Sequence, residues 1–351
     1  MVKKGLLMFL MMLPTFMFAQ GKFKTAWPLT IVNGIKYGIN EEEGYAEVRW
    51  MNPYYDGFEY SGDIVIASEI EYNYKKYPVK SIDNAAFQYS DITSVTIPNT
   101  VTDIGNKSFY QCMKLKSIDI PNSVEKIGDE VFYYCTSLKN VYIGNSLTSV
   151  GYAPFLSCDI ETFEYHCNLK SGRFFGDVSK IDKTLKTVIV GDEVEKVGCF
   201  KNCRNLTDVR LGKNVSVLLE NSFSDCISLT NIEFPKSLTS IGRYSFRESS
   251  NMKTIKSNNP TPPSLGMNAF PKSLYKDATL YVPKGSKDIY KERWGFSKIE
   301  EFDEATTNIS TNLLDNKHED RIYNLYGVQI DSHNMRKGIY IKNGKKVFKN
   351  K

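Results

Sequence analysis

One pattern of hydrophobic and polar positions repeats along most of this chain, and it predicts the architecture. The clearest copy is Ser123–Gly144, SVEKIGDEVFYYCTSLKNVYIG, which follows a near copy at Thr100–Pro121 and returns in part at Ser237–Phe246. The shared pattern is V-x-x-I-G-x-x-x-F-x-x-C-x-x-L-x-x-I-x-I-P/G. A fixed period of this length is typical of a solenoid, in which each repeat buries its apolar face only against its neighbours. The phenylalanine recurs in steps of 23 residues, with one step of 45, at Phe109, Phe132, Phe155, Phe200, Phe223 and Phe246.

Each repeat contains a strand of the form L-x-x-I-x-I, in which alternate residues face opposite sides. About nine such strands follow one another from Ile92 to Val282, and we expect them to lie parallel. The G-x-x-x-F-x-x-C segment between strands predicts a turn and a short helical piece whose phenylalanine fills the core. About 24 additional residues between Cys158 and Leu185 indicate one degenerate repeat. The predicted fold is therefore a mainly β solenoid.

The outward strand positions are the candidates for function, because solenoids commonly bind partners on such a face. One column of small polar residues begins with Ser94, Ser117 and Asn140 and resembles a solvated sheet. The neighbouring column mixes charge with aromatic and aliphatic groups, and aromatic residues with arginine are favoured at interface hot spots. A solvated face without a ligand remains the alternative. From this second column we take as candidate binding residues Asp119, Tyr142, Glu164, Arg210, Glu233, Lys256 and Tyr281.

The first 19 residues read as a signal peptide. Lys3 and Lys4 precede the apolar run Leu6–Phe18, and a plausible cleavage site lies before Gln20. A membrane anchor is the alternative, but the apolar run is shorter than the roughly 20 residues that a bilayer requires. We therefore expect an exported protein with no stable membrane insertion after cleavage.

Residues 20–78 lack the repeat and predict an N-terminal β cap. Strand-like runs at Leu29–Tyr37, Tyr45–Trp50, Gly62–Ile66 and Glu69–Tyr77 are separated by turn signals such as Asn33-Gly34. We expect a small antiparallel unit that covers the first repeat, because an open solenoid end exposes apolar side chains and strand edges. The stretch Trp50–Tyr60 is rich in aromatic residues. Its side chains either stack on sugars or simply pack on the cap.

The repeats occupy residues 79–302, residues 303–320 predict a polar linker, and residues 321–351 predict a separate C-terminal β tail. The tail has strand-like runs at Arg321–Ile330 and Gly338–Ile341, then the turn signal Asn343-Gly344 before Lys345–Lys349. We expect this unit to serve export or attachment. The alternative is a hairpin that docks on the last repeat and caps it.

The net charge of +5 does not indicate a nucleic-acid partner. Nine of the 45 basic residues lie in residues 1–19 and 336–351, which hold no acid, so the rest of the chain has 36 basic and 40 acidic residues. Nucleic-acid binding requires basic charge concentrated on a folded face. We therefore expect no nucleic-acid partner.

The cysteines follow the repeat. A position set by the repeat is a packing position, so we expect buried thiols, and disulfides remain the alternative for an exported chain. His166, Cys167, Cys199 and Cys203 are ligand types for zinc, but their spacing fits no known finger. We therefore predict no metal and no cofactor. The five cysteines that lie three residues after a repeat phenylalanine are Cys112, Cys135, Cys158, Cys203 and Cys226.

The repeated V-x-x-I-G-x-x-x-F-x-x-C-x-x-L-x-x-I-x-I-P over Val79–Pro283 resembles the BspA-type leucine-rich repeat proteins, known mostly from Bacteroidetes and other host-associated microbes. Ala278–Ile299 also resembles the usual end of these arrays. The resemblance implies a secreted or surface protein that binds other macromolecules, commonly in adhesion to host matrix or other bacteria. It supplies no catalytic residues. The tail, with Ile322–Gly327, Lys337–Ile341 and Lys345–Lys349, resembles C-terminal modules of exported Bacteroidetes proteins, some of which are type IX secretion sorting signals.

The predicted function is that of an exported, non-enzymatic module that presents a sheet to a host or bacterial surface protein or glycan. No nucleophile elbow, phosphate loop, dinucleotide fingerprint or H-E-x-x-H motif occurs in the sequence. Two alternatives remain open: a structural surface protein without a specific ligand, and an accessory polysaccharide-binding protein that uses the Trp50–Tyr60 aromatics.

Overall fold

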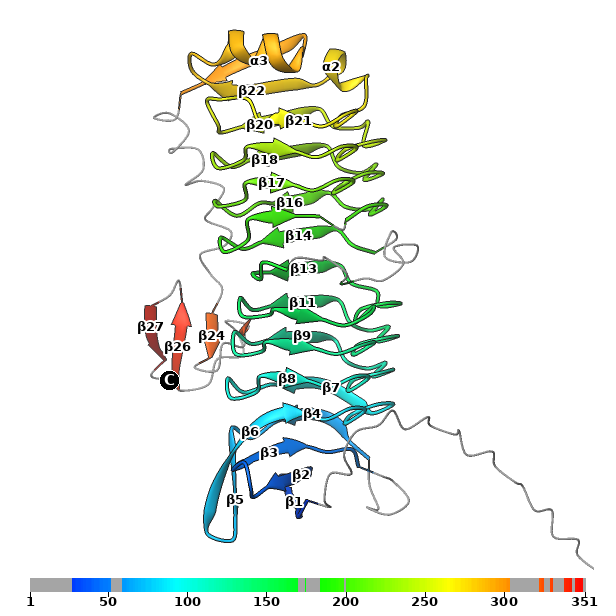
Figure 1. Ribbon diagram of the computed structural model, residues 1–351, viewed down its shortest axis with the longest axis vertical. Coiled ribbons are helices and arrows are strands. Elements are labelled where there is room, and N and C mark those ends of the chain that lie inside the picture. Colours follow the sequence, from blue (N-terminus) through cyan, green and yellow to red (C-terminus); the bar gives the residue numbers. More distant parts are fainter. Residues whose placement is uncertain are drawn as a thin grey trace, which may run out of the picture.

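The computed structural model describes residues 27–51, 59–169, 174, 184–198 and 200–303, and the backbone of four strands within 322–349. The described body is a parallel β solenoid whose successive turns, here called rungs, stack along one long axis (Figure 1). Cys199 and some of the charged residues for which the sequence makes predictions lie outside these ranges. The structure does not test those predictions.

Each rung contributes one strand to a front sheet, which carries the predicted binding column. All nine predicted strands are present, and one further strand lies at each end. Together they line one wall in three parallel hydrogen-bonded groups, with breaks before the third and the eighth strand. The chain order of the front strands is β4 (Ser61–Val65), β7 (Asp91–Thr96), β9 (Ser117–Ile120), β11 (Asn140–Ile143), β13 (Thr162–Tyr165), β14 (Thr187–Val190), β16 (Asp208–Arg210), β18 (Asn231–Phe234), β20 (Thr254–Ser257), β22 (Thr279–Pro283) and β23 (Lys298–Phe302).

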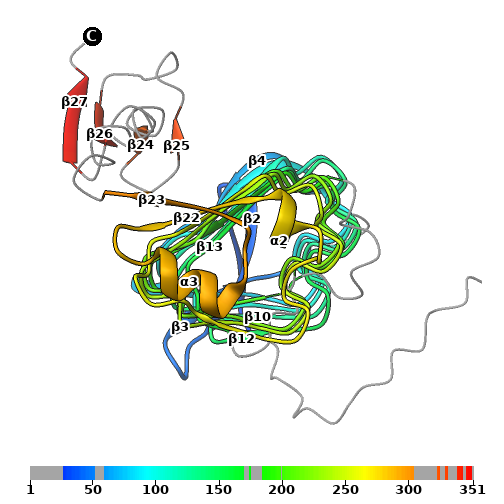
Figure 2. The same cartoon turned by 90° about the horizontal axis from the view of Figure 1, so that it is seen from above.

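A second set of short strands forms a rear sheet on the opposite wall, as the view along the axis shows (Figure 2). The two-residue strands of this set were not predicted, because they are too short to show a period of two, whereas the first strand, Lys75–Ile82, overlaps the predicted run Glu69–Tyr77. In chain order they are β6 (Lys75–Ile82), β8 (Asp103–Ile104), β10 (Lys126–Ile127), β12 (Ser149–Val150), β15 (Lys196–Val197), β17 (Val217–Leu218), β19 (Ser240–Ile241) and β21 (Ser264–Leu265).

The repeat phenylalanines are buried and stack on one another between the two sheets. Ring centroids lie 5.1 Å apart from Phe87 to Phe109, 5.2 Å to Phe132 and 5.1 Å to Phe155, with nearly parallel planes. A second stack runs from Phe200 through Phe223 and Phe246 to Phe270, at 5.7, 5.6 and 5.2 Å. The prediction that the repeat phenylalanine points into the core is therefore confirmed. The stack also contains one more ring at each end than the sequence predicted.

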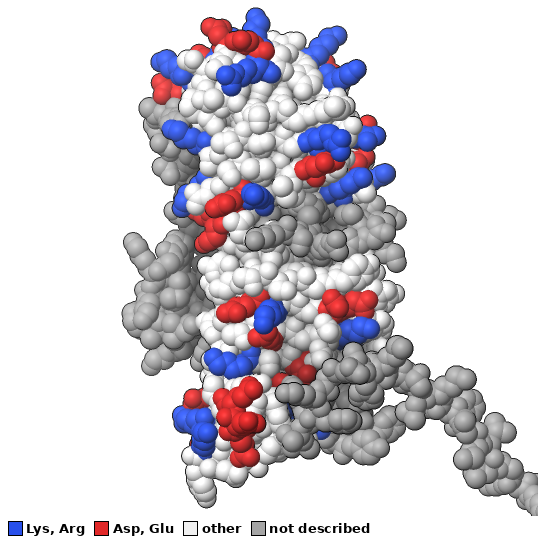
Figure 3. All heavy atoms as spheres, in the orientation of Figure 1, with Lys and Arg blue, Asp and Glu red and all other residues white. Residues whose placement is uncertain are grey.

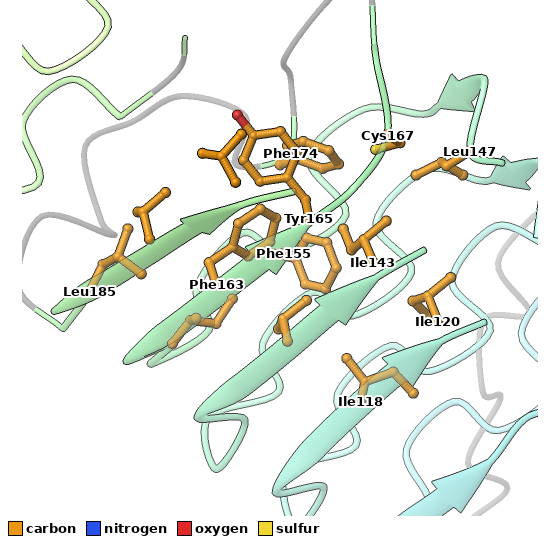
Figure 4. Packing of buried hydrophobic residues seen from close by; sticks show 14 of the residues in the cluster. Ile118, Ile120, Ile143, Leu147, Phe155, Phe163, Tyr165, Cys167, Phe174 and Leu185 are labelled. Carbon is orange, nitrogen blue, oxygen red and sulfur yellow. The ribbon is translucent and has the colours of Figure 1, made fainter. Parts of the chain in front are cut away.

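The degenerate repeat separates the two stacks. Phe163 and Tyr165 on β13 point into the core there, with Phe174 beside them (Figure 4). The ring of Phe163 lies edge-on to Phe155 at 5.8 Å, so these larger strand residues fill the core where the regular ring is missing.

The thiols of the repeat act as hydrogen-bond donors inside the core. Cys135 Sγ donates to the carbonyl oxygen of Phe109 at 3.1 Å, and Cys158 Sγ donates to that of Phe132 at 2.9 Å. Ser249 takes the same repeat position and donates to Phe223 O at 2.8 Å. Burial raises the pKa of the Cys135 and Cys158 thiols. All six cysteines in the described ranges are buried and free, which confirms the prediction for the five repeat cysteines and adds Cys167, for which none was made.

The prediction of a short helical piece after the repeat glycine is wrong. The backbone there forms successive turns in which Lys107 and Gln111 both have positive φ, near 56°. Alternate amides bond within the turn, as Tyr110 N does to Lys107 O, or to the next rung, as Phe109 N does to Val131 O. This ladder between rungs satisfies the backbone and holds a conformation that costs non-glycine residues about 1 kcal/mol or more.

The repeat glycine is required because adjacent rungs approach one another closely at its position. A Cβ on Gly128 would lie 2.4 Å from Asn106 Oδ1 and 2.6 Å from Asn106 N. The corresponding Cβ on Gly151 would lie 2.4 Å from Asp129 Oδ1. The glycine of the motif therefore allows the rungs to stack.

The N-terminal strands are only partly the antiparallel cap that the sequence predicts. Strands β1 (Leu29–Val32), β2 (Ile35–Asn40) and β3 (Tyr45–Val48) form an antiparallel meander, and β5 (Glu69–Tyr72) pairs antiparallel with β6. However, β3 pairs in parallel with β6, and β4 pairs in parallel with β7, so β4 is already part of the solenoid. The predicted division at residue 78 falls inside β6 and stays a prediction.

The C-terminal end of the array is closed by α2 (Leu274–Asp277) and α3 (Lys287–Trp294). The indole of Trp294 lies 5.7 Å from the ring of Phe270 and donates its N–H to Pro263 O at 2.8 Å. Tyr290 and Phe296 are buried beside it. These aromatic residues cover the last ring of the stack.

The C-terminal tail contains an antiparallel sheet in the order β25 (Gln329–Ile330), β24 (Ile322–Asn324), β26 (Gly338–Lys342) and β27 (Lys345–Lys349). The predicted hairpin between the last two strands is confirmed, while the run Arg321–Ile330 divides into two strands. Within the described strands, this sheet pairs only with itself.

Candidate functional site

The front sheet brings the seven predicted residues into one outward column, as predicted. Parallel register places Tyr142 beside both Asp119 and Glu164, and Lys256 beside both Glu233 and Tyr281. Ile189 stands between Glu164 and Arg210. The column therefore contains a central group and a C-terminal group with different surroundings.

The C-terminal group satisfies its charges within the sheet. Lys256 Nζ lies 2.9 Å from Glu233 Oε1, which also accepts a hydrogen bond from Asn258 Nδ2 at 2.8 Å. The same ammonium lies 4.8 Å from the centre of the Phe302 ring. Arg210 Nη2 lies 2.8 Å from Asp208 Oδ2 on its own strand. These side chains hold one another and leave little unsatisfied charge for a partner.

The central group differs, because its first carboxylate has no compensating charge. Asp119 is half-buried, and within the described part of the chain its side chain has no hydrogen bond or ion pair. Burial, and secondarily the charge of Glu164, raises the pKa of Asp119 to about 6. A half-buried carboxylate is unfavourable without a partner. The carboxylate of Asp119 is therefore more buried than an outward carboxylate on a fully solvated sheet would be.

His166 joins this group, although sequence reasoning considered it only as a zinc ligand type. Its Nε2 lies 3.0 Å from Glu164 Oε1, its Nδ1 lies 3.1 Å from Glu193 Oε2, and its ring lies 5.2 Å from that of Tyr142. Gly191 leaves the space that the imidazole of His166 occupies, since a Cβ at position 191 would lie 2.1 Å from His166 Nδ1. The sequence feature that could have identified His166 is its position two residues after Glu164, on the same outward face. Asp119, Tyr142, Glu164 and His166 are called the central patch below.

Two carboxylates favour the charged form of His166. The hydrogen bond to Glu164, and less strongly the one to Glu193, raises the pKa of His166, and partial burial opposes them. A raised folded-state pKa means that the stabilisation is complete below the ordinary value of 6.5 and is lost as the pH rises through the raised value. His166 therefore lies beside two carboxylates, whereas Asp119 has no basic side chain within hydrogen-bond distance among the described residues.

The repeat and this fold identify the family. The model of the BspA type leucine-rich repeat region matches in six copies over residues 68–176 and 182–319, more than two thirds of the chain. The chain belongs to the BspA type leucine-rich repeat family. The match includes the degenerate repeat only in part, since residues 177–181 lie between its two segments.

Several solved structures are similar to this BspA-type chain. A leucine-rich repeat protein from Bacteroides ovatus is 21% identical, with 78% of this chain and 99% of that chain covered and a TM-score of 0.35. A leucine-rich cell surface protein from Faecalibacterium prausnitzii is 17% identical, with coverage of 80% and 97% and a TM-score of 0.27. The pneumococcal vaccine antigen PcpA is 16% identical, with coverage of 80% and 99% and a TM-score of 0.29. A search of curated proteins found no match.

The four candidate zinc ligands do not converge in the described part of this BspA-type chain. His166 lies on the outer face, whereas Cys167 is buried, and burial raises the pKa of its thiol to about 12. Cys203 is buried in the repeat ladder, and Cys199 is outside the described residues. Among the residues described, no group of three or more His, Cys, Asp or Glu side chains could hold a metal ion.

The aromatic stretch Trp50–Tyr60 is only partly described. Tyr60 is buried, its ring lies 4.7 Å from that of Phe87, and its hydroxyl donates to Arg49 O at 2.9 Å. Sugar stacking is therefore wrong for Tyr60, which is part of the core. Trp50 is 43% exposed, and residues 52–58 lie outside the described ranges.

The visible charges are mixed. Basic and acidic side chains alternate over the face shown in Figure 3 and form many pairs between rungs, such as Lys114 with Asp91 at 2.6 Å. This face does not offer the continuous basic surface that nucleic acid requires. In the described part of the chain, the helices are too short or too polar to cross a bilayer.

Proposed function

We propose that this chain is an exported, non-enzymatic binding module that holds a surface protein of a host cell or of another bacterium at the central patch. The family supports a repeat protein that presents a surface. The predicted signal peptide in residues 1–19 supports export. The family pattern contributes no catalytic group, and the adhesion-like role is our proposal for this chain.

The observation that carries the proposal is the unpaired carboxylate of Asp119. Every other charged member of the predicted column has a counter-charge within hydrogen-bond distance, whereas Asp119 is half-buried without one in the described residues. A cation supplied by a partner would remove this unfavourable state. A cationic group that binds at Asp119 therefore gains more free energy than one that binds at a carboxylate that is already paired.

The surroundings of Asp119 suggest the chemistry of the partner. Tyr142 follows on the next strand, and the face of a tyrosine ring attracts a guanidinium or ammonium group. A protein partner with an exposed arginine or lysine in an otherwise apolar patch suits this combination, because tyrosine and a desolvated charge are typical of interface hot spots. The neighbouring small polar column, including Ser117 and Asn140, leaves room for close approach.

The test compares capture of surface proteins by wild-type chain and by charge-reversed variants. We expect Asp119→Lys and Tyr142→Ala to lose the captured partner, while Glu233→Lys, in the paired part of the same column, retains it. High salt should weaken capture by the wild type, since an exposed charge contact is screened. Equal capture by all variants would contradict the proposal.

Two other functions give different outcomes in the same experiment. A structural surface protein without a ligand captures nothing specific with any variant. An accessory polysaccharide-binding protein retains glycan in all front-sheet variants and loses it with Trp50→Ala. The burial of Tyr60 leaves this second function with fewer aromatic contacts than the sequence suggested.

The C-terminal tail completes the proposal as an export or attachment unit. Its support is the self-contained antiparallel sheet of β24 to β27, together with the polar residues 303–320 that precede it. Deletion of residues 320–351 should leave the melting temperature of the solenoid unchanged while delivery to the cell surface or medium falls. A large loss of thermal stability with normal delivery would show that the tail is a cap.

A further inference from the structure

The rear sheet carries a groove that the proposed function does not use. It has a volume of about 410 Å³ and crosses four rungs, at strands β6, β8, β10 and β12. It lies on the wall opposite the central patch (Figure 2). Among its lining groups are Asp103, Asn106, Lys126, Asp129 and Ser149. A groove that crosses successive rungs suits an extended ligand, and parallel strands repeat at about 4.8 Å along it.

The floor of the groove is backbone. Gly105, Gly128 and Gly151 lie there on successive rungs, and the close approach of the rungs excludes a Cβ at each position. The missing side chains would point at the preceding rung, so these glycines bring the rungs together and expose main chain along the groove.

One wall of the groove is a ladder of fixed polar groups. Asn84 Oδ1 accepts from Asn106 N at 2.7 Å, Asn106 Oδ1 accepts from Asp129 N at 2.7 Å, and Asp129 Oδ1 accepts from Tyr152 N at 2.6 Å. These bonds fix each side chain through one oxygen. Within the described residues, the amide groups of both asparagines and the second oxygen of Asp129 have no other partner, so donors and an acceptor repeat at the spacing of the rungs.

The charges of the groove favour a neutral ligand. Arg49 pairs with Glu47 and with Asp83, the latter at 2.7 Å, and Lys126 Nζ lies 3.4 Å from Asp103 Oδ1. Asp129 adds a carboxylate that has no basic partner in the described part of the chain. The slight excess of acid disfavours phosphate, sulfate and uronate groups. Mixed amide, hydroxyl and carboxylate groups instead match the hydroxyl groups of a neutral sugar, which both donate and accept.

An exposed aromatic residue, Tyr152, directly follows Gly151, which lines the groove. Tyr152 occupies the repeat position of Asn106 and Asp129 one rung further on, and it is 53% exposed. Its apolar ring provides a surface against which the apolar face of a sugar can pack, while its hydroxyl stays in water.

We propose that this groove binds an extended neutral oligosaccharide. Asn106 and Asp129 hydrogen-bond hydroxyl groups on neighbouring sugar residues along the groove, and Tyr152 packs against one ring. This site is separate from the protein site on the front sheet. It also differs from the Trp50 region, which the polysaccharide alternative would use.

The same positions further along the rear sheet provide matched controls. Leu219 takes the place of the repeat glycine there, and the wall position holds Glu220 and Arg243, which pair with each other at 2.8 Å. The hollow beside Leu219, with Lys196 and Gly198 in its lining, is far smaller, at about 20 Å³. Ser240 on β19 is the repeat equivalent of Ser149 on β12 and lies outside the groove.

The experiment is titration calorimetry of the full chain from Gln20 with neutral hexasaccharides of glucose, mannose and xylose, and with an oligogalacturonate as the acidic probe. We expect saturable binding of at least one neutral hexasaccharide and none of the acidic probe. Tyr152→Ala and Ser149→Trp should each weaken binding roughly fivefold to tenfold or more, by removing the ring contact or filling the groove. Tyr89→Ala, which alters a tyrosine that is 62% exposed elsewhere, and Ser240→Trp should leave the affinity unchanged.

Melting temperatures of all four variants check folding, and Tyr152→Ala decides the outcome if Ser149→Trp does not fold. The proposal is overturned if no neutral probe binds, if only the acidic probe binds, or if the control variants weaken binding equally. Loss with Trp50→Ala and normal binding by the groove variants would also overturn it. Asp119→Lys should leave sugar binding intact, which separates this site from the proposed function.

Discussion

The two regular stretches of the solenoid, on either side of the degenerate repeat, have the same interior and different exteriors. In both, buried phenylalanines stack at 5.1 to 5.7 Å, and a thiol or hydroxyl donates to a carbonyl of the preceding rung. Outside, the N-terminal stretch carries the unpaired Asp119 and the rear groove, whereas the C-terminal stretch carries paired charges such as Lys256 with Glu233.

This difference separates folding from recognition. The interior positions are fixed by the repeat because every rung must stack on its neighbours. The outward positions are free to vary, so a partner is recognised where outward groups are not already satisfied by one another. The N-terminal stretch is therefore the functional half of the array in our interpretation, and the following predictions test that comparison.

The largest effect is expected in the shared interior. Phe132→Ala in the first stretch and Phe223→Ala in the second should each lower the free energy of unfolding by about 3–5 kcal/mol, through lost burial and the cavity left in the ring stack. Urea denaturation measures both. Midpoints similar to that of the outward variant Glu233→Gln would mean that the faces of the strands are assigned incorrectly.

The next effect distinguishes the two exteriors. Asp119→Asn should raise the free energy of unfolding at pH 7 by about 1–3 kcal/mol, because it removes an unpaired, half-buried carboxylate. The folded-state pKa of about 6 exceeds the ordinary 3.8. The wild type is therefore most stable, relative to this variant, below about pH 4, and it loses that stability as the pH rises through 6. Denaturant titrations from pH 4 to pH 7 measure the change.

The matched control is Glu233→Gln, which removes a paired carboxylate and should not stabilise the protein at any of these pH values. A constant difference between Asp119→Asn and wild type across the range would show that Asp119 is an ordinary solvated acid.

A smaller effect tests the hydrogen bonds shared by the two interiors. Cys135→Ala should cost about 1–2 kcal/mol, because Phe109 O loses its donor, whereas Cys135→Ser should cost clearly less because the hydroxyl still donates. Ser249 shows that the fold accepts serine at this position. Thermal denaturation under reducing conditions compares the variants, and identical losses would show that only the volume of the thiol matters.

The smallest effect is expected where charges are already paired. Lys256→Met should change the free energy of unfolding by less than about 1 kcal/mol, since partly exposed ion pairs contribute little. Chemical denaturation at low and high salt measures it, with Lys256→Arg as the control that keeps the charge. A loss comparable to that of Phe132→Ala would show that the paired column, and not the ring stack, holds the rungs together.

The sequence by itself determined the periodic part of this protein. Residues that touch across rungs are about 23 positions apart, so one period gives the inward position of Phe132, the parallel register and the outward column through Tyr142. The buried thiols followed for the same reason. The predicted faces needed no knowledge of distant contacts, because each rung repeats the environment of the last.

Only the tertiary structure decided what the outward groups do. Whether Asp119 is paired depends on how deeply its carboxylate is buried and on where Glu164 places its charge. Glu193, a partner of His166, comes from the turn after β14 and shows no motif with it. The segment after the repeat glycine was predicted to be helical, because residue types such as the lysine at Lys107 give no indication of a positive φ. The rear groove is lined by side chains and glycines from four successive rungs. Such features depend on desolvation and on contacts between particular side chains, which a pattern of hydrophobic and polar positions does not contain.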